Sequence, residues 1–272
     1  MGRAPDARAA RVVSGRTRSP AVAGSFYPGT LPTLAAAADA LLDAVEGSGA
    51  SRAVVAPHAG YVYSGPIAAS AYAALRGRRE ELARVAILGP AHFVPLRGTA
   101  VPAADAWETP LGALVIDAGL RDAALAAGAV LDDGPHEGEH AVEVQLPFLQ
   151  RLCDVPPAVL PVAVGETAVD EAADLVGALW EEADAVVVST DLSHYLPDAA
   201  AREADRRTAE AIVGRRAEEI GPYDACGSFA LRGLVAHAAR IGAAVRLLDL
   251  RTSADTAGGP ERVVGYGAFA VG

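Results

Sequence analysis

Short runs of apolar residues alternate along the chain with longer, alanine-rich stretches that have helical spacing. The apolar runs are Ala53–Ala56, Val85–Leu88, Val159–Val164, Ala185–Val188, Val245–Leu250 and Val263–Phe269. The helical stretches are Leu31–Val45, Pro66–Leu75, Gly119–Ala127, Val169–Trp180, Ala199–Val213 and Phe229–Ile241. Runs that are apolar throughout fit strands buried on both faces, as in a parallel sheet. The alternation therefore predicts an α/β fold with a central, mostly parallel or mixed sheet and helices on both faces.

The same pattern predicts a single domain, because no repeat, linker or change of composition divides the chain. The first 18 residues contain five arginines and no apolar run long enough for a signal peptide. We therefore expect a disordered basic tail over residues 1–18 and one domain over residues 19–272. No stretch approaches the roughly 20 apolar residues of a membrane helix, so we expect a cytoplasmic protein without a membrane anchor.

Composition narrows the chemistry. The 272 residues include 23 Lys+Arg, all of them arginine, against 34 Asp+Glu, which gives a net charge of −11. An acidic chain is a poor partner for nucleic acid, whose phosphates require a basic patch. Two cysteines cannot form a disulfide framework, and the absence of lysine excludes Schiff-base chemistry. The groups that remain as candidates for catalysis or binding are carboxylates, six histidines, a thiol or a metal.

Polar clusters follow three of the predicted strands. His58 comes two residues after the run Ala53–Ala56, His92 follows Val85–Leu88, and Asp191 and His194 follow Ala185–Val188. Ligands of open α/β sheets bind at the carboxyl ends of the strands. Any one of these histidines alone could be a capped or solvated loop residue. Three of them in the same structural position predict a site.

A fourth contributor is Cys226, which lies just before the helical stretch Phe229–Ile241. A thiol at a helix N-terminus is expected to have a lowered pKa and to ligate metal or act as a nucleophile. The alternative is an inert core residue. Cys153 lies in no motif, and we assign it to the core.

His136 to His140 formally match the H-E-x-x-H pattern of zinc proteases, which requires both histidines on one continuous helix. Here Gly134 and Pro135 precede the first histidine and Gly138 separates the two, so we expect a turn and a helix that begins near Glu139. His140 and Glu143 could still line the cleft, as could Tyr61 at its mouth.

An ordered series of motifs runs from about Pro20 to the C-terminus. It comprises residues 20–28 (PAVAGSFYP), 57–65 (PHAGYVYSG), 89–92 (GPAH), 107–112 (WETPLG), 139–147 (EHAVEVQLP) and 189–195 (STDLSHY). This series resembles the Memo family, called AmmeMemoRadiSam system protein B in microbes. The family is similar in fold to class III extradiol ring-cleaving dioxygenases, with a metal cleft at the strand ends.

The resemblance implies roles for the residues already singled out. His58, His92 and Cys226 fall on the family's metal-ligand positions, and Asp191 and His194 fall on the remaining cleft positions. A thiolate departs from the two-histidine, one-carboxylate set of Fe(II) oxygenases and favours softer metals. Ring cleavage therefore does not follow from the fold. We expect Fe(II) or Cu in the site, with Zn as a further candidate.

Three functions follow from this interpretation. The first is a metal-dependent redox enzyme, dioxygenase-like or an oxidase, that acts on a small substrate with His194, oriented by Asp191, as general acid or base. The second is a binding module that uses the same cleft for a phosphopeptide or a partner protein. The microbial family name implies a functional link to AMMECR1-like and radical-SAM proteins. The third is a hydrolase that uses Cys226 or the histidines at 136 and 140.

Overall fold

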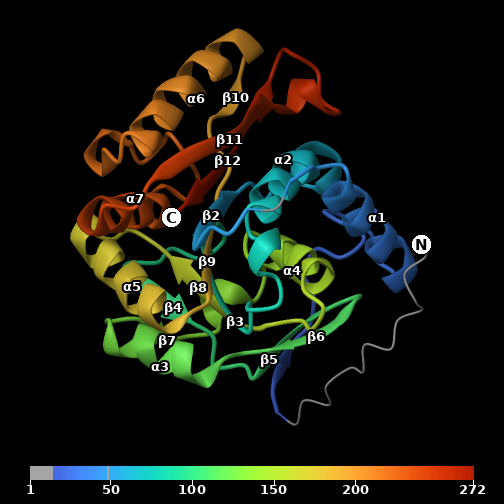
Figure 1. Ribbon diagram of the computed structural model, residues 1–272, viewed down its shortest axis with the longest axis vertical. Coiled ribbons are helices and arrows are strands. Elements are labelled where there is room, and N and C mark those ends of the chain that lie inside the picture. Colours follow the sequence, from blue (N-terminus) through green and yellow to red (C-terminus); the bar gives the residue numbers. More distant parts are fainter. Residues whose placement is uncertain (1–14, 48) are drawn as a thin grey trace.

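The computed structural model describes residues 15–47 and 49–272. It shows one α/β domain built around a mixed sheet (Figure 1). The strands of this main sheet are β2 (Ala53–Ala56), β3 (Arg84–Pro90), β4 (Thr99–Val101), β7 (Val130–Leu131), β8 (Ala158–Val164), β9 (Ala185–Ser189), β10 (His194–Leu196), β11 (Val245–Thr252) and β12 (Val263–Val271). A separate small sheet contains β1 (Thr17–Arg18), β5 (Ala106–Thr109) and β6 (Gly112–Val115).

Four parallel strands form the centre of the main sheet, in the order β2, β9, β3, β8. The flanking strands β12 and β4 run antiparallel to their central neighbours. Every residue of β2 and β9 is buried, which explains why these strands are apolar up to their last residues. The sheet is therefore mixed, with a parallel centre, as the sequence predicts.

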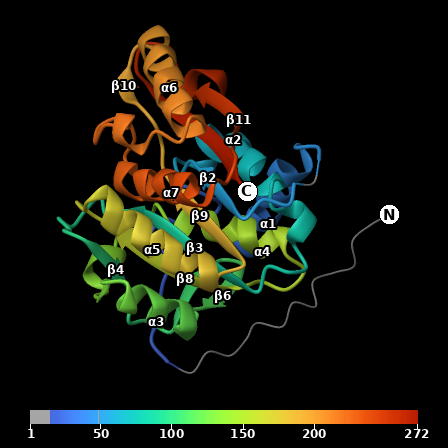
Figure 2. The ribbon, with the colours of Figure 1, turned by 60° about the vertical axis from the view of Figure 1, so that its left-hand side comes forward.

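Helices cover both faces of the sheet. They are α1 (Leu31–Asp43), α2 (Tyr61–Ala73), α3 (Ala118–Ala126), α4 (Leu146–Leu152), α5 (Val169–Glu182), α6 (Asp198–Val213) and α7 (Ser228–Ile241). The helices α3, α5 and α7 pack on one face, and α1, α2 and α4 pack on the other (Figures 1 and 2). The helix α6 packs on β11 and β12. None of the helices in the described residues is long and apolar enough to cross a membrane.

The predicted elements are confirmed, but two helix starts differ from expectation. The helix α2 begins at Tyr61, so Pro66 lies inside it rather than in its first turn. The amides of Tyr63 and Ser64 bond to the Gly60 carbonyl and close a helical turn earlier than the apolar spacing indicates. The helix α4 begins at Leu146, not near Glu139, because a 3-10 turn at Glu143–Gln145 precedes it.

The start of the domain also differs from expectation. Thr17 and Arg18 form β1 and pair with Ala106 and Trp107 of β5. The guanidinium of Arg18 lies 4.2 Å from the centre of the fully buried Trp107 ring. The strand β1 therefore begins two residues before Ser19, where the sequence predicts the start of the domain, and Arg18 packs against the core. Residues 1–14 of the predicted tail lie outside the described residues.

Candidate metal centre

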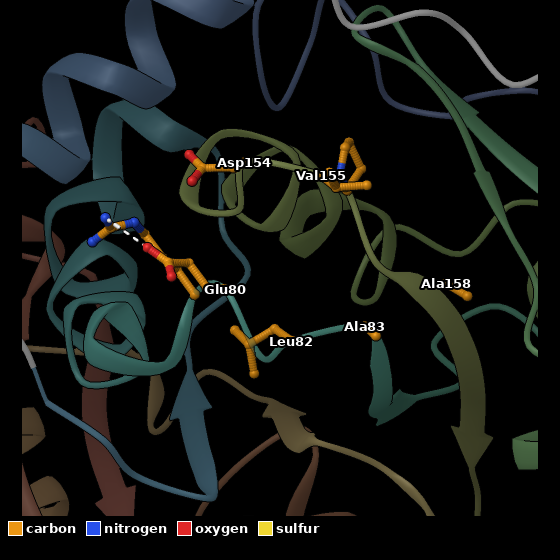
Figure 3. A pocket seen from close by; sticks show the side chains of 8 residues that line it. Glu80, Leu82, Ala83, Asp154, Val155 and Ala158 are labelled. Atoms are coloured by element: carbon orange, nitrogen blue, oxygen red, sulfur yellow. Dashed lines mark hydrogen bonds and ion pairs between the residues drawn. The ribbon is translucent and has the colours of Figure 1, made fainter.

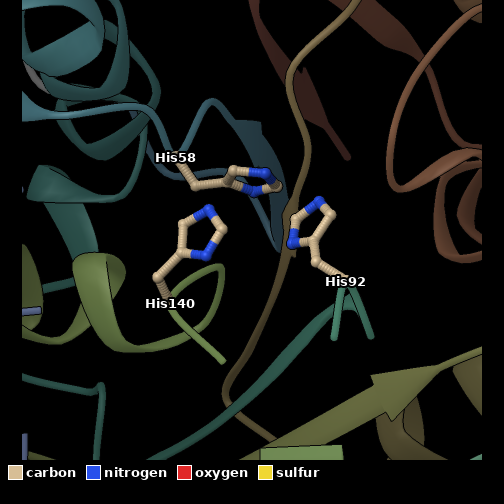
Figure 4. A group of neighbouring side chains, drawn as sticks. All are labelled: His58, His92 and His140. Carbon is tan, nitrogen blue, oxygen red and sulfur yellow. The ribbon is translucent and has the colours of Figure 1, made fainter. Parts of the chain in front are cut away.

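Three imidazoles converge at the carboxyl edge of the central sheet. They belong to His58, His92 and His140, and one possible ligand atom from each lies within 4.8 Å of the other two. Figure 4 shows the three rings reaching a common space from three separate segments. The ring of His92 stacks on His140 at 4.8 Å between centroids, and His58 meets His92 edge-on at 5.3 Å. This is the geometry of a candidate metal centre.

The parallel centre of the sheet explains two of the three positions. His58 follows β2 and His92 follows β3, and each strand pairs with β9. The carboxyl ends of parallel neighbours meet at one edge, so the two loops are adjacent. His140 arrives differently, from the irregular segment that leads to α4. Because His140 does not follow a strand, the rule that ligands bind at the carboxyl ends of strands could not identify it as a candidate metal ligand, although the motif of residues 139–147 contained it.

Glu139 ties two of the histidines together. Its carboxylate accepts the Nδ1–H of His92 at 2.9 Å and the backbone amides of His92, His140 and Ala141 at 2.6 to 2.8 Å. Burial alone would raise the pKa of this carboxyl, but these bonds, with the one from the His92 ring foremost, lower it to about 2. No pattern in the sequence indicated that Glu139 belongs to the site. An ionised carboxylate that fixes a ligand histidine is a common feature of metal sites.

Burial keeps two of the imidazoles neutral at physiological pH. Burial, and after it the neighbouring His92, lowers the pKa of His58 to about 3. Burial, and after it His58, lowers the pKa of His140 to about 4. Only neutral imidazole offers a lone pair to a metal. The cluster therefore presents metal-ready nitrogen atoms at pH 7.

The structure also brings Cys226 to this edge, just before α7. Its Sγ lies 3.2 Å from Nε2 of His58 and 3.3 Å from the amide nitrogen of Asp191, which donates to it. A Cβ on Gly227 would lie 2.8 Å from Cβ of Thr190, so glycine permits this close approach. The expected lowering of the thiol pKa is wrong. Burial, and after it the Asp191 carboxylate, raises the pKa of Cys226 to about 12.

Asp191 and His194 lie at the same edge, but no hydrogen bond joins them in the described contacts. The Asp191 carboxylate instead accepts the backbone amide of His58 at 2.7 Å, and burial raises the pKa of this carboxyl. His194 is exposed, and its Nδ1–H donates to the Leu192 carbonyl at 2.8 Å. Asp191 therefore holds the loop that carries His58, while a backbone carbonyl orients His194.

The structure places two of the predicted cleft residues behind the cluster. Tyr61 is buried, its ring packs 4.9 Å from Phe148, and its hydroxyl donates to the Val144 carbonyl. Glu143 is fully buried and accepts bonds from Arg18, Tyr27 and the amides of residues 21 and 22. Glu143 thereby anchors the N-terminal segment beside the site.

That anchored segment supplies a side of the site that the sequence did not indicate. The ring of Phe26 lies 4.6 Å from the ring of His140, and the Phe26 carbonyl accepts the Tyr61 amide. Phe26 belongs to the motif of residues 20–28, which is the one signal that could have identified it. The His140 ring thus contacts both the His92 ring and the Phe26 ring.

His136 does not join the cluster. It is buried, its Nε2–H donates to the Ala100 carbonyl at 3.2 Å, and its ring meets Trp107 at 5.6 Å. It lies in a 3-10 turn, Gly134–His136, and not on a helix shared with His140. The zinc-protease pattern is therefore not realised, as the sequence analysis expects.

A pocket lies at the opposite edge of the sheet, where β3 and β8 begin. This pocket of about 490 Å³ is lined by Arg79, Glu80, Leu82, Ala83, Asp154, Val155, Pro156 and Ala158 (Figure 3). Its described lining contains neither histidine nor cysteine. The candidate chemistry is thus concentrated at the carboxyl edge.

Comparison with known proteins supports the family resemblance across nearly the whole chain. The model of the family described as Memo-like protein matches residues 18–270. A MEMO1 family protein of Methanococcoides burtonii is 37% identical over 273 residues, which cover 93% of this chain and 99% of the relative. The MEMO1 family proteins of Aquifex aeolicus and Nitrosopumilus maritimus are 35% and 33% identical, over 92% and 93% of this chain and 97% and 98% of their own lengths. The chain therefore belongs to the Memo family.

Proposed function

We propose that this protein binds one transition metal ion between its clustered imidazoles and uses it in oxidoreductase chemistry on a small substrate. The observation that carries the proposal is the convergence of His58, His92 and His140, whose ligand atoms lie within 4.8 Å of one another. Two ligands of one tetrahedral metal lie roughly 3.3 to 3.8 Å apart, as bond lengths of about 2.0 to 2.3 Å require. Small side-chain movements would bring the three nitrogen atoms to these separations.

The donor set fits such an ion. The lowered pKa values of His58 and His140 supply neutral imidazoles. His92 gives its Nδ1–H to Glu139, which leaves Nε2 as its ligand atom. Imidazole donors suit Fe, Cu and Zn. A bound ion of this kind supplies a Lewis acid and, if it is Fe or Cu, a one-electron redox centre.

The chain's own residues supply proton transfer and positioning. Because Nδ1–H of His194 donates to the Leu192 carbonyl, the neutral ring keeps a lone pair on Nε2. This nitrogen can accept a substrate proton and return it later, a task worth typically 10²–10⁴-fold in rate. Asp191 keeps the loop of His58 in place through the bond to its amide. Phe26 packs against His140 and restricts that ring.

The proposal leaves two candidates for the third ligand. His58 and His92 are common to both sets. The third ligand is His140 if the metal lies among the three close imidazoles. It is the Cys226 thiolate if the metal lies at the positions that the family resemblance implies. The 3.2 Å between Sγ of Cys226 and Nε2 of His58 suits a hydrogen bond, and a separation of roughly 3.5 Å, which a small side-chain movement would reach, would suit two ligands of one ion.

The test uses anaerobic protein loaded with Fe(II). Nitric oxide binds ferrous iron that has an open coordination position and gives a characteristic electron paramagnetic resonance signal. We expect this signal in the wild type and its loss in His58→Ala. An iron-loaded wild type that gives no signal would contradict an open redox site.

The third ligand can be identified from the ultraviolet absorption spectrum of the protein loaded with Co(II). A thiolate ligand gives an intense ultraviolet charge-transfer band, which Cys226→Ser would remove and His140→Ala would leave. Absence of this band in the wild type, with metal binding lost in His140→Ala, would assign the position to His140.

A binding module is the second candidate, favoured by exposed aromatic residues beside the site residues. Phe93 follows His92 and is 66% exposed, Tyr195 follows His194 and is 63% exposed, and Tyr223 precedes Cys226 by three residues and is 95% exposed. Such side chains are common in recognition surfaces. A product formed by the wild type but not by His194→Ala would decide for the enzyme. Phosphopeptide binding that survives chelation of the metal would decide for the module.

A further inference from the structure

A buried chain of polar side chains lies directly behind His58. Tyr72, Gln145 and Ser189 have no exposed surface, and His58 is 2% exposed. The Tyr72 hydroxyl donates to Oε1 of Gln145 at 3.0 Å. Nε2 of Gln145 donates to the Pro57 carbonyl at 2.9 Å and to Oγ of Ser189 at 2.8 Å. Burying so many polar groups is unfavourable unless every one is paired, so a completed chain specifies one arrangement.

The orientation of each group in this chain is determined by its partners. The Pro57 carbonyl can only accept, so the side of Gln145 that faces it is the NH₂ group. The hydroxyl of Ser189 has one hydrogen, which it donates to the Ala141 carbonyl at 2.6 Å. Oγ of Ser189 is therefore an acceptor toward both remaining neighbours. One of these is Gln145, and the other is Nδ1 of His58 at 3.0 Å.

The hydrogen bonds of Ser189 determine the His58 tautomer. If Nδ1 carried a lone pair, two lone pairs would face each other at 3.0 Å. With hydrogen on Nδ1, His58 donates to Ser189 and every group in the chain is satisfied. Nε2 then carries the lone pair, and it is the nitrogen that lies 3.2 Å from Sγ of Cys226.

We propose that Ser189 and Gln145 are positioning residues that fix His58 as the Nδ1–H tautomer and aim its Nε2 lone pair at the metal centre. Ser189 is the last residue of β9, and Gln145 ends the 3-10 turn before α4. The pair therefore links the two segments behind the centre to the His58 ring. The proposal deepens the proposed function and rests on it for the role of the lone pair.

The first experiment reads the tautomer without any metal. Protein labelled with ¹⁵N at histidine is stripped of metal, and its long-range ¹H–¹⁵N spectrum is recorded at pH 7, with His58 assigned from its loss in His58→Gln. We expect a protonated Nδ1 and an unprotonated Nε2. A protonated Nε2 on His58 in the wild type would overturn the proposal, and this result requires no variant of the chain to fold except that used for assignment.

The second experiment removes the acceptor. Ser189→Ala should convert His58 to a mixture of tautomers and weaken Zn(II) binding, measured by competition with a chelator, by about 10- to 100-fold. Ser189→Thr keeps the hydroxyl and should have the wild-type His58 tautomer and the wild-type Zn(II) affinity. Gln145→Leu should act in the same direction as Ser189→Ala. Wild-type tautomer and affinity in both Ser189→Ala and Gln145→Leu would overturn the proposal.

The matched control is Ser64→Ala. Ser64 is also a buried serine near His58, but its hydroxyl donates to the Ala59 carbonyl. We expect this variant to leave the His58 tautomer and the Zn(II) affinity unchanged. An equal loss in Ser64→Ala would show a general loosening of the loop and overturn the specific role of Ser189. A wild type with the expected tautomer that binds none of Fe(II), copper and Zn(II) would refute the proposed function and leave the tautomer assignment intact.

Discussion

Carboxylates have different roles in two regions of this molecule. Behind the histidine cluster, Glu143 has no exposed surface, and its partner Arg18 is 8% exposed. On the outer face of α6, Glu203 is half exposed and pairs with two arginines of its own helix. Water screens the second kind of pair, whereas the first is isolated from solvent. The contrast indicates that the Arg18–Glu143 pair, which anchors the N-terminal segment beside the site, is shielded from water, whereas the pairs of Glu203 on α6 are not.

The largest expected effect is that of Glu143→Ala. This change leaves Arg18 buried without its carboxylate partner and removes the acceptor of Tyr27 and of two backbone amides. Breaking a buried pair in this way typically costs about 3 to 5 kcal/mol. Urea denaturation would measure the loss. A change below about 1 kcal/mol would show that water reaches this region and would remove the contrast with α6.

His136, beside the same N-terminal segment, should make stability depend on pH. Burial lowers its pKa from 6.5 to about 4 in the folded protein. Above pH 6.5 the imidazole is neutral in both states. Between pH 6.5 and about 4 the unfolded chain takes up a proton that the folded protein does not, so stability falls as the pH falls, by up to roughly 3 kcal/mol.

The measurement is urea denaturation between pH 8 and pH 4. His136→Gln keeps a donor for the Ala100 carbonyl but has no proton to gain, so its stability should fall less over this range. Identical pH profiles of stability for His136→Gln and the wild type would contradict the idea that His136 causes the pH dependence.

A smaller effect is expected for Tyr27→Phe. This change removes the hydroxyl that donates to Glu143 at 2.6 Å and leaves the buried ring in place. A hydrogen bond to a charged group contributes about 2 kcal/mol. Thermal or urea unfolding should therefore show an intermediate loss, below that of Glu143→Ala. A loss as large as that of Glu143→Ala would mean that the tyrosine, and not the ion pair, anchors the segment.

The smallest effect is expected on α6. Glu203→Ala removes exposed pairs with Arg206 and Arg207, which contribute about 0.5 kcal/mol or less and weaken further in salt. Stability measured at low and at high salt would check this. A loss above about 1 kcal/mol that persists in high salt would contradict the idea that water access separates the two regions.

The sequence predicted the strands β2, β3, β8, β9, β11 and β12 because each contains an apolar run, whereas the short strands β4, β7 and β10 contain no run long enough to be recognised. It placed His58 and His92 at one edge because each follows a parallel strand. Glu139 and His140 were harder to place, since they lie in an irregular segment whose path depends on tertiary contacts. Ser189 was missed because a single polar residue at the end of an apolar strand gives no sign of its partners.

The central claim is that the imidazole cluster holds one metal ion. The most direct measurement is metal content by mass spectrometry after anaerobic loading with Fe(II), copper or Zn(II) and removal of unbound ions. The wild type and His136→Gln should retain about one ion per chain, and the double variant His58→Ala, His92→Ala should retain none. A wild type without bound metal, or a double variant that retains as much as the wild type, would contradict the claim.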